Sequence, residues 1–527
     1  MLTGLSFEIA APPVAAAPNR ADVACFIGMV ARRPGVPLPA DVREQLRSAG
    51  WEGGPWALDA ERMDSLLQVP IVVDAWDMFD QLFAWERRPL RADRAGWCAT
   101  YLGAAVRSFF AHGGRRAVII RAGDPWPYLG GADRVVEQRA RLERLVPARA
   151  FAPRPFEAAN PPVWRGIEHL YGLGEVSHLC MPDLADICSV EPQAVPVVNP
   201  PPPAPEVFVE CSGGELPTPA DRGLRFVGAP RLDPGGFSAW AAAIDATGEF
   251  LARHRRDALL VAGLPLPHAD ARSPVPGGSH AQADWLGFLR QSGVLEGEGS
   301  NEAGNGTAAS AFVQLAWPWL QTVRSDDLPQ RLESAEGLLA GVLARNALSR
   351  GTFRSIAGTP LPQVVTPEPD PDLGLGIDSP TARLAERVCL IGHEPDGIAV
   401  LSDVTSSPDS AWRPGGVSRL MATLIRAALR VGEVQLFEAN GPELWTRIRR
   451  TFEELLSGFY RVGALGGRSE SEAFQVRCDR GTMSQNDIDN GRLRAEITVL
   501  PAAAIERITV SLELFSGRAE GRLPEVA

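Results

Sequence analysis

Residues 477–497, RCDRGTMSQNDIDNGRLRAEI, gather the oxygen-bearing side chains that calcium-binding loops use. A loop of the EF-hand type needs oxygen ligands at positions 1, 3 and 5, a glycine at position 6 and a glutamate at position 12. With Gly491 at position 6, Ile488 occupies position 3 and Ile497 occupies position 12. Because an isoleucine side chain cannot coordinate a hard cation, the spacing argues against a calcium site.

Two strands joined by a polar connection explain this stretch better. Apolar residues alternate with polar ones on both sides of it, as they do in half-buried strands. The alternating residues are Phe474, Val476 and Cys478 before the connection, and Leu493, Ala495, Ile497 and Val499 after it. Asn490-Gly491 is a strong turn signal, because both residues tolerate positive φ.

A second group combines imidazole, thiol and carboxylate side chains within eleven residues: His178, Cys180, Asp183, Asp186 and Cys188. Zinc prefers these ligand types. In a strand His178 and Cys180 would share a face, but Cys188 lies beyond the break that a proline makes. No CxxC or HxxxH spacing supports the group. A structural role is therefore favoured, and metal binding and redox chemistry are the alternatives.

The chain contains no lysine, so its strongly basic side chains are all arginines. A Walker A loop, a protein-kinase site, a Schiff-base enzyme and an S-x-x-K acylase all require a lysine. The sequence also lacks a G-x-S-x-G elbow, a G-x-G-x-x-G turn after a strand and an HExxH pair. It therefore predicts no catalytic residues, no metal ligands and no cofactor, and an enzyme is disfavoured.

The composition, with 527 residues of which 45% are hydrophobic and 22% charged, is that of a globular protein with several domains. A net charge of −12 disfavours a nucleic-acid partner, because phosphate contacts need a basic face. No apolar run approaches the ~20 residues of a membrane span, so we expect no membrane insertion. The seven scattered cysteines and an N-terminus without a basic signal-peptide region favour a cytoplasmic protein.

Helix and strand patterns alternate over much of the chain, which is typical of α/β folds. The expected elements are a buried strand at 23–30, helix-then-strand pairs at 97–122 and 237–267, and helices at 132–146, 331–347, 412–432 and 440–463. Residues 176–188 have the pattern of a strand that runs into a loop. Six prolines within residues 196–205 indicate an inserted loop or linker over about 190–235.

Several blocks occur in a characteristic order: DVACFIGMVARRPG and AAVRSFFAHGGRRAVIIRAG near the front, AWPWLQT with AGVLARNALSRGTFRSIAG (316–358), GVSRLMATLIRAAL (416–429), FEANGPELWTRIRRTFEELLSGFYRVGALGG (437–467) and AFQVRCDRGTMSQNDIDNGRLRAEITVLPAAAIERITVSLEL (473–514). Together they resemble the contractile tail sheath family of phage tails and phage-tail-like injection systems. The family's N-terminal arm motif is present only as GLSFEIA, and its paired arginine only as Ser418-Arg419-Leu420. The 190–235 insertion has no counterpart in the family.

The resemblance implies a structural subunit that forms six-fold rings, stacked helically around an inner tube, and contracts to drive the tube through a target envelope. The implied partners are further copies of the chain, an inner tube protein, and baseplate and cap proteins. Assembly is implied in the bacterial cytoplasm, in a phage-tail-like particle that either stays in the cell or is released. A specialised baseplate-proximal or capping sheath paralogue is the alternative, and an α/β enzyme is a more distant one.

The expected fold class is α/β (α+β) and multidomain. We expect an N-terminal linker arm at 1–22, an α/β sheath domain at 23–350 that carries the 190–235 insertion, and a C-terminal sheath domain at 351–527. The C-terminal domain should lie at the inner radius against the tube. The insertion should lie on the outer surface, because a proline-rich segment suits a solvent-facing position.

Both ends of the chain carry short alternating patterns that suit strands. The apolar members are Leu5, Phe7 and Ile9 at the front, and Ile508, Val510, Leu512 and Leu514 at the end. An unpaired edge strand invites pairing with another chain, so we expect both arms to add strands to neighbouring subunits.

The tube contact is predicted on the helix at 442–459. Arg447, Arg449 and Arg450 would present guanidinium groups to an acidic tube surface, while Trp445, Ile448 and Phe452 pack inward. The alternative is a solvated arginine face that contacts nothing.

Overall fold

A computed structural model describes most of the chain between Arg20 and Ala502. The described residues are 20–130, 134–147, 160–192, 223–268, 289, 294–295, 308–371, 383–435, 438–489 and 492–502. The arm strands expected at Leu5–Ile9 and Ile508–Leu514, and most of the 190–235 insertion, lie outside these residues.

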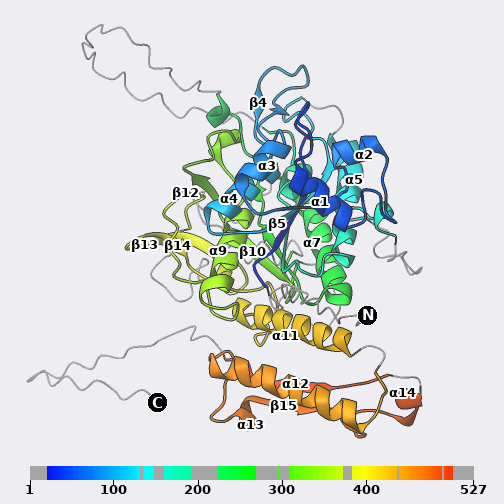
Figure 1. The fold of residues 1–527 in the computed structure, drawn as a ribbon. Coiled ribbons are helices and arrows are strands. Elements are labelled where there is room, and N and C mark those ends of the chain that lie inside the picture. Colours follow the sequence, from blue (N-terminus) through cyan, green and yellow to red (C-terminus); the bar gives the residue numbers. More distant parts are fainter. Residues whose placement is uncertain are drawn as a thin grey trace, which may run out of the picture.

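The larger of two units is built on an eight-stranded sheet with the order β14-β13-β10-β8-β6-β1-β5-β2 (Figure 1). Its strands are β1 (Ala24–Met29), β2 (Ile71–Val73), β5 (Ala117–Gly123), β6 (His178–Cys180), β8 (Leu259–Gly263), β10 (Val313–Trp317), β13 (Cys389–Glu394) and β14 (Gly397–Val400). The six inner strands run parallel, and the two edge strands run antiparallel to their neighbours. Buried parallel strands are mainly apolar, as β1 is throughout; β5 is apolar except for the buried Arg121, which donates to the Val30 carbonyl at 2.7 Å.

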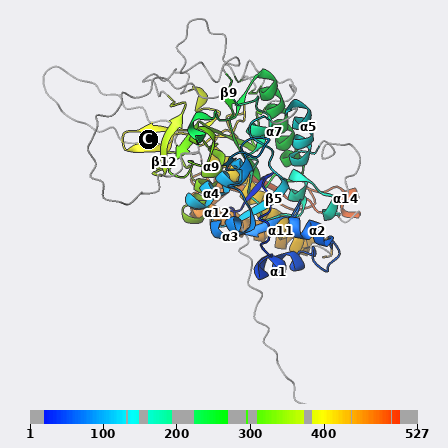
Figure 2. The ribbon, with the colours of Figure 1, turned by 90° about the horizontal axis from the view of Figure 1, so that it is seen from above.

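Helices cover both faces of this sheet. They are α1 (Ala40–Ser48), α2 (Ala60–Ser65), α3 (Trp76–Leu82), α4 (Tyr101–Ala111), α5 (Arg134–Leu145), α6 (Leu184–Ile187), α7 (Pro234–His254) and α9 (Glu336–Ser349). Both views place α5 and α7 on the other side of the sheet from α4 and α9 (Figures 1 and 2). Three two-stranded ribbons lie outside the sheet: β3 (Arg88–Pro89) with β4 (Trp97–Cys98), β7 (Arg231–Leu232) with β9 (Leu266–Pro267), and β11 (Trp319–Thr322) with β12 (Val364–Glu368).

Helices α4 and α9 pack at close range because small residues line their contact. Helix α4 starts where the Thr100 hydroxyl accepts a hydrogen bond from the Gly103 amide at 3.1 Å. A Cβ atom on Gly337 of α9 would lie 2.4 Å from the carbonyl oxygen of Ala105, and one on Gly341 would lie 2.5 Å from that of Phe109. Larger residues at these two positions would therefore push the helices apart.

The smaller unit contains α12 (Pro442–Arg461), α13 (Glu470–Ala473), β15 (Phe474–Arg477), α14 (Gln485–Asp489) and β16 (Glu496–Val499). Its hydrophobic core is separate from that of the large sheet. Helix α11 (Gly415–Val434) lies between the two units (Figure 1). The large core continues through β13 and β14 to Val400, beyond the boundary expected at residue 350, because those strands complete the sheet.

The expected α/β, multidomain fold class is confirmed. The strand expected at 23–30 is β1, the pair at 97–122 is α4 and β5, and the helices at 412–432 and 440–463 are α11 and α12. Residues 176–188 differ in part: β6 is followed by the short helix α6 where a loop was expected. Asp183 precedes this helix and accepts hydrogen bonds from the amides of Met29 and Leu102. These bonds hold the segment against the C-terminal end of β1.

Two carboxyl groups, those of Glu336 and Asp183, are buried near the C-terminal ends of the inner strands. Neither forms an ion pair among the described residues. Burial raises the pKa of Glu336 to about 8, although the Gly263 amide donates to its carboxylate at 3.0 Å. Burial likewise raises the pKa of Asp183 to about 7. Both groups therefore favour their protonated forms in the folded protein.

We expect Glu336→Gln to reduce the loss of stability with rising pH. A group whose pKa is raised on folding stabilises fully below its unfolded pKa, and that stability is lost as pH rises through the folded pKa. The window for Glu336 runs from pH 4.5 to about 8. Across this pH window, the urea midpoint of unfolding should fall less for Glu336→Gln than for the natural chain. The exposed control Glu61→Gln should show the same fall as the natural chain. Identical slopes for all three proteins would contradict the assignment.

Candidate assembly interface

Helix α11 is anchored to the large unit through Arg419. Its guanidinium donates to both carboxylate oxygens of Asp403, at 2.6 and 2.8 Å, and to the carbonyls of Thr352 and Arg354. Both partners of the ion pair are buried, with side chains 3% and 1% exposed. Burial alone would raise the pKa of the Asp403 carboxyl, but the adjacent Arg419 holds it below its usual value. The pair is therefore ionised and fully desolvated.

Arg426, two turns further along α11, makes a second anchor. It donates to the carbonyls of Asp257 and Val176 at 2.6 and 3.1 Å, and its Nε lies 3.4 Å from the Asp257 carboxylate. It also donates to the carbonyl of Arg20, where the described chain begins. The segments that lead into β1, β6 and β8 thus meet at one guanidinium group. Charged hydrogen bonds of this kind fix α11 firmly to the sheet.

The other face of α11 is apolar and receives α12. Leu420, Leu424 and Ala428 of α11 belong to the same hydrophobic cluster as the inner face of α12. On α12, Trp445, Ile448 and Phe452 are buried, as predicted. The Trp445 indole donates to the Asn440 side chain at 2.7 Å, which fixes the start of the helix. The position of the smaller unit is therefore set by α11.

The three predicted arginines lie on the opposite, solvent-facing side of α12. Arg447 is 3.9 Å from Glu438 and Arg449 is 3.7 Å from Glu453, and the arginine side chains are 53% and 43% exposed. Arg450 is also exposed. These pairs are long and solvated, so the guanidinium groups are available to another surface.

The outer face of α12 carries both signs of charge. A shallow hollow of about 680 Å³ is lined by Pro442, Glu443, Thr446, Arg447, Arg450, Thr451 and Glu454. Two glutamates therefore lie beside two of the predicted arginines. The hollow is therefore of mixed charge rather than uniformly basic.

The polar connection at 477–497 is a structural turn that contains the short helix α14. Strands β15 and β16 pair in antiparallel fashion, with Phe474 opposite Val499 and Arg477 opposite Glu496. Ser484 and Asp487 cap α14 reciprocally, because the amide of each donates to the side chain of the other at 3.1 Å. The Ser484 hydroxyl also donates to the Asp487 carboxylate at 2.7 Å, and this bond, together with that from the Ser484 amide, holds the pKa of Asp487 below its usual value. Of the residues that resemble a calcium loop, Asp487 thus stabilises a helix start, while Asn490 and Gly491 lie outside the described residues.

The second group of chemistry-bearing residues is used in packing. Asp186 pairs with Arg88 at 2.7 Å and with Arg134 at 3.4 Å, under the end of the sheet. Burial lowers the pKa of His178 to about 3, which keeps its imidazole neutral. Across the described ranges, no three His, Cys, Asp or Glu side chains are grouped in a way that could hold a metal ion.

Sequence reasoning missed the anchoring roles of Arg419 and Arg426. Their spacing of seven residues places both on one face of α11, and that periodicity is visible in the sequence. Their partners, Asp403 and Asp257, could not be chosen from the sequence because Asp257 is separated from Arg426 by 169 residues.

No protein-family model matches the chain, and no curated protein matches it. Among helices in the described residues, none is long and apolar enough to cross a membrane.

Solved structures of contractile assemblies do match. A chain in the anti-feeding prophage (AFP) baseplate in its contracted state is 16% identical, with a TM-score of 0.57 over 98% of this chain and 100% of that chain. A chain in the contracted AFP helical sheath is 18% identical, with a TM-score of 0.52 over 97% and 99%. A chain in the contracted PVC sheath complex, an extracellular contractile injection system, is 14% identical, with a TM-score of 0.52 over 98% of both. The chain thus has the fold found in contractile sheath structures, as the sequence resemblance predicted.

We expect Arg419→Met to destabilise the folded chain by ~3–5 kcal/mol, because it leaves Asp403 charged and unpaired in the interior. Adding Asp403→Asn should recover part of this loss, since no buried charge then remains. Arg447→Met on exposed α12 is the matched control and should change the unfolding free energy by less than ~0.5 kcal/mol. Equal effects of Arg419→Met and Arg447→Met in urea unfolding would refute the anchoring role.

Proposed function

We propose that the chain, which shares its fold with contractile-sheath structures, is a structural subunit of a contractile sheath. The observation that carries the proposal is the match to sheath chains over nearly the full length of both partners. In this role the subunits form six-fold rings stacked around an inner tube. Contraction drives the tube through a target envelope, and no nucleotide is consumed because the energy is stored in the extended assembly.

Within such a sheath we place the outer face of α12 against the inner tube. The face is exposed and carries Arg447, Arg449 and Arg450 without a tight internal partner. Exposed ion pairs are worth ~0.2–1 kcal/mol each. Contacts of that strength hold a ring in register while many act together, and they release when the sheath widens away from the tube.

The two arms are proposed to link neighbouring subunits by strand addition. The described residues that adjoin the two arms, Arg20 and Ala502, lie near α11 and the smaller unit, which supports this role. Arg20 is bound by Arg426 of α11, and the Ala502 amide donates to the Ala464 carbonyl beside β16 at 3.0 Å. Arms that leave from one region can bridge adjacent copies while the large units rotate as rigid bodies.

A baseplate-proximal sheath paralogue is the second candidate. Chains in AFP baseplate structures match this chain as well as the sheath chains do, with TM-scores of 0.55 and 0.57 against 0.52. A main sheath protein would polymerise into long tubes, whereas a baseplate-proximal paralogue would stop at one or two rings. In either role the subunit would assemble in the bacterial cytoplasm with inner tube, baseplate and cap proteins.

Reversing the three arginines of α12 should prevent assembly on the inner tube. We expect Arg447→Glu, Arg449→Glu and Arg450→Glu, combined in one variant, to remove co-sedimentation of the chain with its tube protein. The folded monomer should persist, because none of the three side chains is buried. Arg43→Glu with Arg47→Glu on exposed α1 is the control and should assemble normally. Unchanged assembly of the α12 variant would favour a solvated arginine face.

Removal of residues 1–12 should leave a folded monomer that cannot polymerise. Each strand added between subunits would make several backbone hydrogen bonds, each worth ~0.5–1.5 kcal/mol net. Size-exclusion chromatography and electron microscopy of the truncated chain should therefore show monomers, with a circular dichroism spectrum like that of the intact chain. Contractile sheaths built from the truncated chain would refute strand exchange without refuting the sheath function.

A further inference from the structure

The loop that joins β3 and β4 presents an exposed basic and aromatic surface. Residues 91–97, RADRAGW, are all exposed, and Trp97 keeps 42% of its surface in contact with solvent. Among the described residues, no carboxylate forms an ion pair with Arg91 or Arg94. Tryptophan and arginine are the residues most enriched in the energetically important parts of protein interfaces.

This loop is held in one conformation by its own hydrogen bonds. The Leu90 amide donates to the Gly96 carbonyl at 3.0 Å, and the Ala95 amide donates to the Asp93 carboxylate at 2.9 Å. Arg94 adopts a positive φ of 60°, a conformation that a non-glycine residue keeps only where its surroundings impose it. The base of the loop is anchored by the buried Arg88–Asp186 ion pair. The exposed side chains are therefore preorganised, which lowers the entropic cost of binding.

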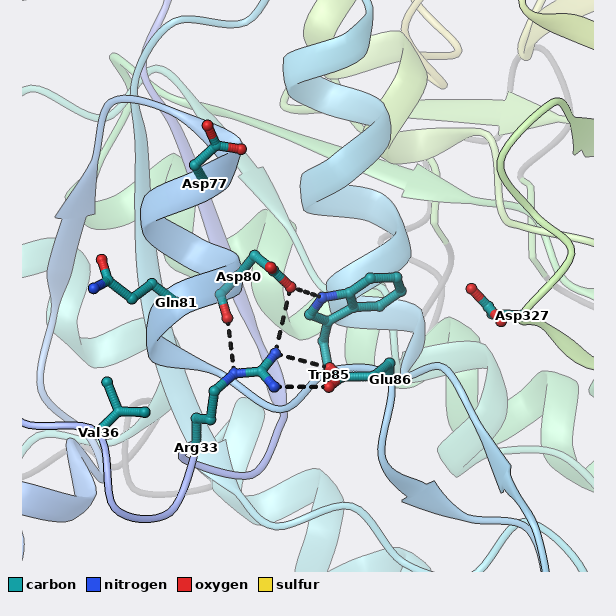
Figure 3. Close-up of a pocket in the computed structure, with 8 residues that line it drawn as sticks. All are labelled: Arg33, Val36, Asp77, Asp80, Gln81, Trp85, Glu86 and Asp327. Carbon is teal, nitrogen blue, oxygen red and sulfur yellow. Dashed lines mark hydrogen bonds and ion pairs between the residues drawn. The ribbon is translucent and has the colours of Figure 1, made fainter.

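A complementary pocket of about 760 Å³ lies beside α3, in the same chain (Figure 3). Its lining residues are Arg33, Val36, Asp77, Asp80, Gln81, Trp85, Glu86 and Asp327. Four carboxylates against one guanidinium give the lining a net charge of −3.

The walls of the pocket are rigid. Arg33 donates to both oxygens of Glu86, at 2.8 and 3.0 Å, and the Trp85 indole donates to Asp80 at 2.7 Å. The Arg107 guanidinium lies 4.6 Å from the centre of the Trp85 ring. In Figure 3, Asp77 and Asp327 stand on either side of this fixed centre.

We infer that the 91–97 loop of one copy docks into the α3 pocket of a second copy. The loop offers two arginines and a tryptophan, and the pocket offers a net negative charge beside an aromatic wall, so the two surfaces are complementary in charge and composition. When the loop of each copy engages one neighbour and its pocket engages another, the contact is head-to-tail and repeats from copy to copy. Such a contact suits a ring or a helical stack and needs no other protein.

The position of both surfaces deepens the proposed sheath function, on which this part of the inference rests. The β3–β4 ribbon and α3 lie at the end of the large unit that is farthest from α12 (Figure 1). If α12 faces the inner tube, the loop and the pocket face outward. The contact would then link neighbouring subunits at the outer radius, far from the arms that root near α11.

A photo-cross-linker placed at position 97 tests the contact directly. Trp97→p-benzoylphenylalanine is introduced into the full chain, which is then mixed with an isotopically labelled copy and irradiated. We expect cross-links between copies that map to residues 76–86 or 324–331. Asp77→Arg with Asp327→Arg in the labelled copy should reduce their yield about tenfold, which corresponds to ~1.4 kcal/mol. Arg91→Glu with Arg94→Glu in the copy that carries the probe reverses the charge of the loop and should restore the cross-link yield.

The matched control carries the same probe at Trp412, which is 39% exposed. Its cross-links should not map to the pocket and should not respond to the Asp77 and Asp327 substitutions. Position-97 cross-links that map elsewhere, or only within one copy, would overturn the contact even if tubes form, and the sheath function would stand. Cross-links at the pocket without ring or tube formation would support the contact between copies and would contradict the proposed sheath function.

Discussion

The structure depends on the burial of two arginines on one face of α11. Arg419 and Arg426 place their charges inside the large unit, where Asp403 pairs with Arg419 and Asp257 is shared between Arg426 and the buried Arg255. Removing Asp403 alone would leave Arg419 as an uncompensated charge in the interior, which is strongly destabilising. The opposite face of α11 is apolar and carries the smaller unit. The smaller unit is therefore joined to the eight-stranded sheet through α11.

Several carboxyl groups are used to hold the fold together. Asp403 is bound by an arginine, Asp183 by backbone amides, and Asp487 by the start of α14. Each carboxylate satisfies a donor that would otherwise be buried or unpaired. Such internal hydrogen bonds hold segments distant in sequence in a single geometry.

The sequence predicted the elements whose periodicity is strong, such as β1, α4 with β5, and the inner face of α12 with Trp445 and Phe452. It did not predict that β13 and β14 join the large sheet, because that pairing is made with strands distant in the sequence. The helix α14 was also missed, although the Ser484–Asp487 spacing is a capping signal. At the candidate site, the helical spacing of the apolar residues correctly predicted that Arg447 is exposed. The ion pairs of α11 could not be predicted, since Asp257 is 169 residues from Arg426 and no periodic pattern links Asp403 to Arg419.

The central claim is that this chain is a sheath subunit, and its assembled form tests that most directly. The measurement is electron microscopy of the purified full-length chain, with and without its inner tube protein, followed by rotational averaging of end views. The account predicts cog-wheel rings or tubes with six-fold symmetry that enclose a central channel. Monomers only, under all conditions with the tube protein present, would contradict it.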